Sequence, residues 1–514
     1  MSINFQTLGI DYLLVNSTNE FLTEYSNLSE NSRYTITNFS GSTGDVLMTK
    51  NGEIFLFVDG RYHIQAEQEI FPQITLIKLQ NNQKQDEEIL KLIPEGATLG
   101  IISKKVSQAR LETFKNVKIE LLTTDPINNH TEINHNKIEI LPLNLCGKTF
   151  EEKIKNLPKP YFTSNLEEVS YILNARDFSN NYSSKIQAKL LITEYQSVLF
   201  TNMEIDNNID SLSIQTLDKT REILQQFSYP IYVDKSSISA YDYSAIIMPE
   251  IIDSPIKTMK SIKTTEEIKS YKQAFNATDK ALLATRGFIM NNSVSEFEIA
   301  KELEKNFKKE GAKCLSFKSI VAKNKNSALA HYSKCSKDEI INDGDLVLID
   351  CGGYFENGLA TDITRVFVKG EASSEQRKIY TTVLKMFLNA FFSNATNGYD
   401  CDSAARNLIK YFPVKNYTFG HGLGHGLGVN VHEAPPTLNP SEQAKTEFQN
   451  GMCFTIEPGL YNPDTFGVRL ENSCYYENNQ IKSFTQMPYE SKLIDYSLLN
   501  EQETEWLKEF PLIW

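Results

Sequence analysis

Two aspartates stand at the ends of two β-branched, aliphatic runs that a glycine-containing connection joins. The runs cover residues 346–349 and 363–368 and predict a β-hairpin. Asp350 follows the first run and Asp362 precedes the second. Antiparallel pairing would bring the two carboxylates together, where like charges repel unless a cation lies between them. One aspartate at a strand end is ordinarily a turn residue, so a cation site requires further ligands.

Further ligands occur downstream, in a glycine-rich run over residues 420–433. This run holds three of the seven histidines of the chain, His421, His425 and His432. Glycine at almost every second position rules out a stable helix and indicates an extended or turning backbone that passes close to other groups. Taken alone, the run would also fit a plain loop.

Two glutamates lie on predicted strands beyond the histidines. Glu457 ends a short strand that begins at residue 454. Glu471 lies in the segment 467–472, whose strict alternation turns the apolar residues to a core and turns Arg469 and Glu471 to the opposite side. Taken alone, a strand glutamate beside an arginine is usually a surface ion pair.

The combination is more informative than its parts. Two aspartates, two glutamates and a choice of histidines form an oxygen-rich donor set with one nitrogen, which suits hard or borderline divalent ions. Manganese fits best, and cobalt or zinc is possible. The carboxylates are too many for a single tetrahedral zinc, so we interpret the set as a two-metal hydrolytic site.

The same residues carry a family resemblance. The order LIDCGG, ATDITR, GHGLGHGLGVNVHE, TIEPG and GVRLEN resembles the metal-binding signature of the pita-bread metallopeptidases, which include aminopeptidase P, prolidase, methionine aminopeptidase and the metal-free creatinases. Matched residue by residue, the resemblance implies five metal ligands: Asp350, Asp362, His425, Glu457 and Glu471. It also implies that His421, His432 and His331, in the segment SALAHY, surround the substrate.

The resemblance implies an activity and roles for these residues. The expected reaction is release of the N-terminal residue from peptides with proline in the second position, by a water that two metal ions activate. Glu457 would accept the proton. His331 and His432 would steady the carbonyl oxygen, and His421 would contact the substrate near the leaving proline. Arg469 would orient a ligand.

Three domains are expected to position these residues. Two smaller α/β units, 1–125 and 135–258, similar to creatinase N-terminal domains, precede an α+β catalytic domain of pita-bread fold at 260–514. The smaller units share a layout, a strand beginning at Tyr12 or Tyr161 and then a polar turn, which is compatible with duplication. The polar stretch 123–137 is interpreted as a linker, although it contains His130 and His135.

Helices separate the strand groups of the expected catalytic domain. Capping boxes at Thr264, Ser295 and Ser373 predict the starts of three helices, and Asp402 is predicted to cap a fourth. Helices between the acid-bearing strands indicate a mixed sheet backed by helices.

Composition limits the partners and the compartment. The 514 residues carry a formal net charge of −13, which argues against nucleic acid or an acidic membrane as a general partner. The seven scattered cysteines include no CxxC pair and fit a reducing compartment. No targeting or membrane-spanning pattern occurs, so a cytoplasmic protein is expected, and we expect it to be a homodimer.

Several alternatives remain at this point. A prolidase would cleave only Xaa-Pro dipeptides, but prolidases generally carry one N-terminal domain, and about 260 residues precede the catalytic domain here. A non-catalytic scaffold of the same fold would have lost ligands, whereas all five are present. Creatinase-like chemistry without metal is disfavoured for the same reason.

Overall fold

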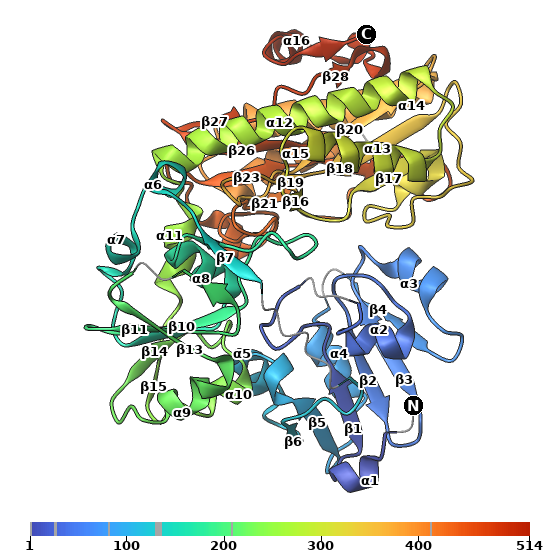
Figure 1. Cartoon of the computed structure of the whole chain (residues 1–514). Helices are drawn as coiled ribbons and strands as arrows, with labels where there is room; N and C mark the ends of the chain where they lie inside the picture. Colours follow the sequence, from blue (N-terminus) through green and yellow to red (C-terminus); the bar gives the residue numbers. More distant parts are fainter. Residues whose placement is uncertain (1–2, 25–27, 81–82, 129–135, 207–208, 412–413) are drawn as a thin grey trace. The chain divides into compact units, whose positions relative to one another are not determined.

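A computed structural model describes residues 3–24, 28–80, 83–128, 136–206, 209–411 and 414–514. His130 and His135 of the predicted linker lie outside the described residues. The chain divides into two compact units, whose helices and strands are labelled in Figure 1. Unit 1 comprises Met1–Glu139, Phe150–Ala175 and Ile186–Pro255, and unit 2 comprises Ile140–Thr149, Arg176–Lys185 and Ile256–Trp514.

Unit 1 contains two six-stranded sheets with one topology. Their strand orders are β4-β3-β2-β1-β5-β6 and β13-β11-β10-β8-β14-β15. Corresponding neighbours also pair in the same sense, antiparallel around β2 and around β10 and parallel elsewhere. The shared layout predicted from the sequence is thus a shared fold. The strands are β1 (Tyr12–Val15), β2 (Asp45–Thr49), β3 (Ile54–Val58), β4 (Thr75–Lys78), β5 (Thr98–Ile102), β6 (Lys118–Leu122), β8 (Tyr161–Thr163), β10 (Ala188–Ile192), β11 (Ser197–Thr201), β13 (Leu212–Gln215), β14 (Ile231–Val233) and β15 (Pro249–Ile251).

Short helices and a small sheet complete the first half of the chain. Asn165 accepts hydrogen bonds from the backbone N–H groups of Glu167 and Glu168 and so begins α8, the acid-led helix expected after Tyr161. The helices are α1 (Phe5–Leu8), α2 (Ser32–Thr37), α3 (His63–Glu69), α4 (Gln85–Lys91), α5 (Gln108–Leu111), α6 (Leu143–Cys146), α7 (Phe150–Ile154), α8 (Leu166–Ile172), α9 (Thr220–Leu224) and α10 (Ala240–Tyr243). The small sheet has the order β12-β7-β9, with β7 (Lys137–Ile140), β9 (Ala175–Arg176) and β12 (Glu204–Ile205).

Unit 2 is built from long helices around short strands. The capping boxes at Thr264, Ser295 and Ser373 all form, which confirms the three predicted helix starts. The helices are α11 (Pro255–Ser261), α12 (Thr265–Asn291), α13 (Glu296–Lys309), α14 (Ser374–Phe391), α15 (Gly398–Tyr411) and α16 (Glu501–Leu507). The strands are β16 (Cys314–Leu315), β17 (Ile320–Lys323), β18 (Leu346–Cys351), β19 (Gly353–Tyr354), β20 (Ile363–Val368), β21 (Gly424–His425), β22 (Thr437–Leu438), β23 (Cys453–Ile456), β24 (Gly459–Tyr461), β25 (Gly467–Arg469), β26 (Asn472–Glu477), β27 (Gln480–Ser483), β28 (Tyr489–Glu490) and β29 (Leu512–Ile513).

The prediction that Asp402 caps a helix is wrong. The helix α15 begins four residues earlier, at Gly398, so Asp402 lies inside it. Asn397 caps the helix instead, because its Oδ1 accepts a hydrogen bond of 2.8 Å from the backbone N–H of Asp400. Asp402 is nearly inaccessible to solvent, and it bonds to other groups described below.

The sheet β17-β18-β20 is covered on both faces. Val347 and Ile349 of β18 pack in one apolar cluster with residues of α12 and α13, which lie side by side in Figure 1. Leu346 and Leu348 point the other way, into a second cluster that includes α14. Asp350 continues this second face at the end of the strand. The sheet therefore fixes the direction of Asp350 through the burial of its neighbours.

Two further features bear on the sequence-based expectations. No disulfide joins any of the seven cysteines, all of which lie among the described residues, and five of them are buried. Within the described ranges, no helix combines the length and the apolar content that a bilayer crossing needs.

Candidate active site

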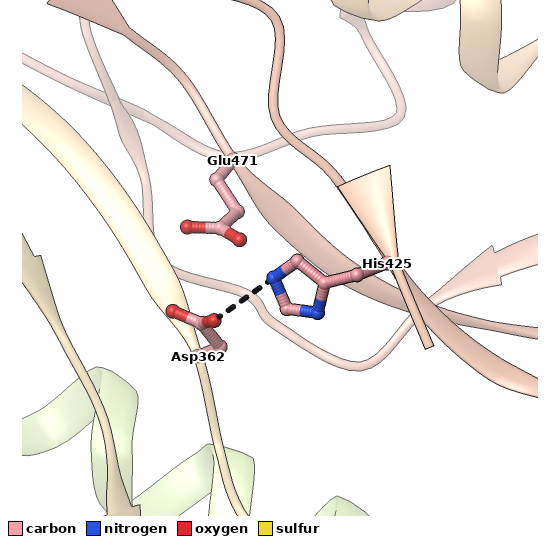
Figure 2. Close-up of side chains that lie close together, drawn as sticks. All are labelled: Asp362, His425 and Glu471. Carbon is pink, nitrogen blue, oxygen red and sulfur yellow. Dashed lines mark ion pairs between the residues drawn. The ribbon is translucent and has the colours of Figure 1, made fainter. Parts of the chain in front are cut away.

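Three predicted ligands converge in unit 2. Donor atoms of Asp362, His425 and Glu471 all lie within 4.8 Å of one another, in the arrangement that a metal ion needs (Figure 2). The Nε2 atom of His425 lies 3.6 Å from Oδ2 of Asp362 and 3.4 Å from Oε1 of Glu457. A fourth predicted ligand, Glu457, thus borders the same histidine.

The predicted hairpin brings the two aspartates to one face. Strands β18 and β20 pair antiparallel, with Asp350 opposite Thr364. Asp362 lies two residues before Thr364 and so is directed to the same side of the ribbon. The hairpin expectation is confirmed, and its connection contains the additional short strand β19.

Glycine brings the histidine-bearing strand close to the strand that leads to Glu457. A Cβ on Gly424 would lie 2.0 Å from the carbonyl oxygen of Thr455, so only glycine fits there. The backbone N–H of His425 then reaches Oγ1 of Thr455 at 3.2 Å. The backbone N–H of Glu457 donates to the carbonyl of Leu423 at 2.7 Å. As expected, the run contains no helix in its described residues.

Arg469 connects ligands that come from different strands. Its Nη2 donates to Oδ2 of Asp350 at 2.6 Å, and its Nε donates to Oγ1 of Thr364 at 3.0 Å. The hydroxyl of Thr364 in turn donates to Oε2 of Glu471 at 2.8 Å. Arg469 thus pairs with Asp350 and is linked to Glu471, which lies between β25 and β26, through Thr364, a residue that the sequence patterns did not single out.

The buried carboxyl groups of the site lie close to one another and have too few cationic neighbours to balance their charge. Burial and the neighbouring carboxylates of Glu471 and Asp350 raise the pKa of Asp362 well above its ordinary value. The pKa of Glu471 is raised in the same way, by burial and by Glu457 and Asp350. Burial also raises the pKa of Glu457 to about 7, although Arg469 opposes the shift. Without a bound cation, these carboxyl groups therefore bind protons more tightly than ordinary carboxylic acids do.

The hydrogen bond at Nδ1 determines what Nε2 of His425 can do. Nδ1 lies 3.0 Å from the carbonyl oxygen of Gly426, and a carbonyl only accepts, so Nδ1 carries the proton. A neutral His425 therefore directs the lone pair of Nε2 toward the carboxylate oxygens of Asp362 and Glu457. Electron pairs that face one another at these distances repel unless a proton or a metal ion lies between them.

The donor set therefore fits divalent metal ions. Oδ1 of Asp350 is buried and has no hydrogen-bond partner among the residues that the structure describes, which leaves it free to bind a cation. Carboxylate oxygens with one imidazole match the preference of manganese and similar ions.

The other predicted histidines lie around this cluster. The ring of His432 packs edge-on against that of His425, with centroids 4.5 Å apart. His331 lies in a turn, and the carbonyl of the preceding Ala330 accepts a hydrogen bond of 3.3 Å from Nη1 of Arg469. Both rings are partly exposed, as substrate contacts must be.

His421 is connected to the cluster through Tyr461. The Tyr461 hydroxyl accepts from Nη1 of Arg469 at 3.0 Å and lies 2.8 Å from Nε2 of His421. Nδ1 of His421 lies 2.7 Å from the carbonyl of Gly422 and donates to it. The tyrosine can therefore donate its own proton to Nε2, which favours the neutral histidine with its proton on Nδ1.

Asp402 and Arg406 hold the backbone on both sides of His421. Arg406 donates to Oδ2 of Asp402 at 2.6 Å, to the carbonyl of Phe419 at 3.2 Å, and to the carbonyl of His421. Oδ1 of Asp402 accepts from the backbone N–H of Leu423 at 3.2 Å. The i, i+4 spacing of Asp402 and Arg406 indicates that the two side chains can pair on a helix. It does not identify the backbone groups around His421 to which they bond.

A buried ion cluster holds the residue after His432. Glu433 lies 2.8 Å from Nζ of Lys263 and 3.4 Å from Nζ of Lys260, and all three side chains are almost inaccessible to solvent. The two lysines lower the pKa of Glu433 to about 2, against the effect of burial. Glu433 also accepts from the backbone N–H of Val429 at 2.9 Å, which ties the cluster to the glycine-rich run. Sequence patterns did not identify this cluster.

Comparison with known proteins finds family models that match three successive parts of the chain. Residues 269–478 match the model of metallopeptidase family M24, and residues 4–130 and 129–267 each match a creatinase/prolidase N-terminal domain. The chain is 27% identical to a probable Xaa-Pro aminopeptidase P of Coprinopsis cinerea, over 98% of this chain and 91% of that protein. It is also 27% identical to aminopeptidase P1 of Lotus japonicus, over 98% and 93%.

Solved structures confirm the expected fold. An X-prolyl aminopeptidase from Caenorhabditis elegans, described as a cytosolic enzyme with a di-nuclear active site, matches with a TM-score of 0.89 at 21% identity, over 99% of this chain and 92% of that one. A prolidase from Thermococcus sibiricus matches with a TM-score of 0.51 at 28% identity, over 59% and 86%. The chain therefore carries a metallopeptidase family M24 domain over residues 269–478, two creatinase/prolidase N-terminal domains before it, and a catalytic domain of pita-bread fold.

Proposed function

We propose that the protein is a metal-dependent aminopeptidase that releases the N-terminal residue from peptides with proline in the second position. The observation that carries the proposal is the direction of Nε2 of His425, which faces two carboxylates across a gap that suits a cation. The similar full-length proteins named Xaa-Pro aminopeptidase P and aminopeptidase P1 support the choice of substrate.

Two divalent ions, which we propose to be manganese, would lower the pKa of a water that attacks the scissile carbonyl. We propose that Asp350, Asp362, His425, Glu457 and Glu471 together would hold these ions. Five donors exceed the needs of a single ion, and the di-nuclear site of the C. elegans enzyme is consistent with two.

The other side chains act on the peptide. Glu457 would accept the proton from the attacking water. His331 and His432 would donate hydrogen bonds to the carbonyl oxygen as it becomes negative. His421, held by Tyr461, would contact the leaving proline. Arg469 would keep Asp350 in position.

The molecular setting is part of the proposal. We propose a cytoplasmic homodimer with the three domains 1–125, 135–258 and 260–514; the word cytosolic in the description of the C. elegans enzyme supports the compartment. The two sheets of like topology in unit 1 support a division of the first half of the chain into two domains.

One assay tests the proposal directly. Protein depleted of metal would be supplied with Mn²⁺ and given an Xaa-Pro dipeptide and an Xaa-Pro-Pro tripeptide, with elemental analysis of the same sample. We expect about two ions per chain and hydrolysis of the first bond of the tripeptide. Hydrolysis of the dipeptide alone would indicate a prolidase. Absence of bound metal would contradict the enzyme assignment and leave a non-catalytic scaffold.

A further inference from the structure

A segment that lies outside the match to metallopeptidase family M24 contacts the glycine-rich run over residues 420–433. Residues Arg176–Lys185, here called the arm, belong to unit 2, whereas the chain before and after the arm belongs to unit 1. The match to family M24 begins only at residue 269. Arg176, Ser184 and Lys185 are nevertheless buried, at 2%, 0% and 8% exposure. Burial of two cations and a hydroxyl requires polar partners.

Those partners lie on two loops of the catalytic domain. Nε of Arg176 and Oγ of Ser184 both donate to the carbonyl of Gly358, at 3.1 and 2.7 Å. Oγ of Ser184 also lies 3.5 Å from the carbonyl of Val429, which accepts a hydrogen bond of 3.1 Å from Tyr354. The arm thus meets the turn that joins His425 to His432.

Lys185 makes the contact closest to a substrate-binding histidine. Its Nζ donates to Oδ1 of Asn430 at 2.7 Å, in a buried position. Nδ2 of the same asparagine donates to the backbone carbonyl of His432 at 3.0 Å. Because the amide accepts on one side and donates on the other, Lys185 determines which way Asn430 is turned, and Asn430 holds the backbone of His432.

The rest of this run is anchored by other groups. Glu433 bonds to Gly426 through its backbone and to Lys263 through its side chain, which fixes the end of the run. Gly428 is held through its carbonyl by the N–H of Ala360. Val429 is held by its N–H, which donates to Glu433, and by its carbonyl, which accepts from Tyr354. The arm adds a contact to the side chain of Asn430.

We propose that the arm positions His432 for its contact with the substrate, with Lys185 and Asn430 as the positioning residues. This inference rests on the proposed function, because it assigns His432 to the peptide carbonyl. A small displacement of such a group reduces the rate strongly, so loss of the Lys185–Asn430 contact should lower kcat roughly tenfold to a hundredfold. KM and metal content should change little, since neither residue is assigned to the metal ions.

The test compares Lys185→Met, Asn430→Leu and the double variant with the parent, all loaded with Mn²⁺ and assayed on the Xaa-Pro-Pro tripeptide. Both changes keep the side-chain volume and remove the hydrogen bonds. If the residues act in series, the double variant will be no slower than the slower single variant. Lys185→Arg should recover part of the lost rate. Lys313→Met is the matched control, because Nζ of Lys313 lies over the ring of Phe178 in the arm, 5.8 Å from its centroid.

A second measurement does not depend on catalysis. Amide hydrogen exchange in the segment 427–431 should become faster in Lys185→Met and in Asn430→Leu and stay at the parent rate in Lys313→Met. Parent-like kcat with unchanged exchange in both variants, or fully additive losses in the double variant, would overturn the inference. A parent protein that cleaves no Xaa-Pro peptide would contradict the proposed function instead, and exchange would still decide whether the arm holds this turn. If Lys185→Met does not fold, Asn430→Leu tests the same contact from its other side.

Discussion

At the scale of single residues, the site is a group of acids that the fold holds closer together than their charges favour. The raised pKa values of Asp362, Glu457 and Glu471 follow from burial and from mutual repulsion. Without metal, protonation of the carboxyl groups relieves this repulsion. Bound cations would allow all the carboxylates to ionise. Metal binding and proton release are therefore linked in this site.

The metal-binding histidine and the substrate-binding histidines should differ in the effects of their substitution. His425→Ala should lose both metal and rate, because its Nε2 faces the ligand carboxylates. His331→Ala and His432→Ala should lower kcat by roughly 10²-fold or more and retain about the parent's metal content, as expected for donors to the developing oxyanion. Elemental analysis beside tripeptide kinetics decides the assignment. Loss of metal from His432→Ala would show that the ligand was assigned to the wrong histidine.

Asp362→Asn should separate folding from function. The amide keeps the shape of the side chain and removes one negative charge, so kcat should fall by orders of magnitude while the hairpin still forms. The metal-free variant should be at least as stable as the metal-free parent, because the repulsion with Asp350 and Glu471 is relieved. Urea unfolding of both proteins in a chelator, with metal analysis of the loaded samples, tests this. A variant that binds two ions and works at the parent rate would contradict the proposed mechanism.

The stability of the metal-free protein should fall as pH rises. The folded pKa of Glu457 is about 7, above the ordinary value of 4.5, so the folded state binds more protons between these values. The free energy of unfolding should therefore decrease from about pH 4.5 to pH 7, on the order of 3 kcal/mol from this residue, and Asp362 and Glu471 act in the same direction. Urea titrations measure the trend, and Glu457→Gln should weaken it. With Mn²⁺ bound the trend should reverse, since protons then compete with the metal.

At the scale of elements, the sequence predicted the features that depend on neighbouring residues. It did not predict contacts between residues that are far apart in the chain. The capping boxes and the hairpin depend on residues a few positions apart, so their patterns identify them directly. The Arg469–Asp350 pair joins residues 119 positions apart, and no local pattern specifies it. Asp402 illustrates the same limit, because an acid near a helix start resembles a cap unless its distant partner, Leu423, is known.

The variant Arg406→Lys tests whether helix α15 positions His421. A lysine cannot make the several directed hydrogen bonds that the guanidinium makes to Asp402, Phe419 and His421. The free energy of unfolding should fall by about 1–3 kcal/mol, and kcat/KM should fall with metal content unchanged. The exposed Arg377, changed to lysine, is the control. Parent-like kinetics in Arg406→Lys would mean that the position of His421 does not depend on α15.

At the scale of the whole molecule, the two units carry different parts of the chemistry. All the residues proposed to act on metal or peptide lie in unit 2, together with both tryptophans of the chain, Trp506 and Trp514. The sequence predicted the duplicated layout of the first half, because each copy repeats its own local pattern. It did not predict that the arm belongs with the catalytic domain, since nothing in the arm's composition indicates its distant partners.

Metal should stabilise unit 2 selectively. Tryptophan fluorescence reports on unit 2 alone, and excess Mn²⁺ should raise the Tm seen by this signal by roughly 5 °C. Hydrogen exchange in unit 1 should stay unchanged in the same samples. Asp362→Asn should show a smaller shift and serves as the control. An equal effect of Mn²⁺ on exchange throughout unit 1 would contradict a site confined to unit 2.

The spacing of the ligands along the chain has a consequence for biosynthesis. Asp350 and Glu471 are separated by 121 positions. At typical elongation rates, a ribosome needs roughly 6–24 seconds to travel between their codons. Throughout that interval a nascent chain presents an incomplete donor set, while the first sheet, complete by residue 122, has already emerged and can fold. Insertion of the proposed metal ions would thus be a late event in the maturation of this protein, and a chain deprived of them would combine a folded first sheet with a donor set that holds no metal.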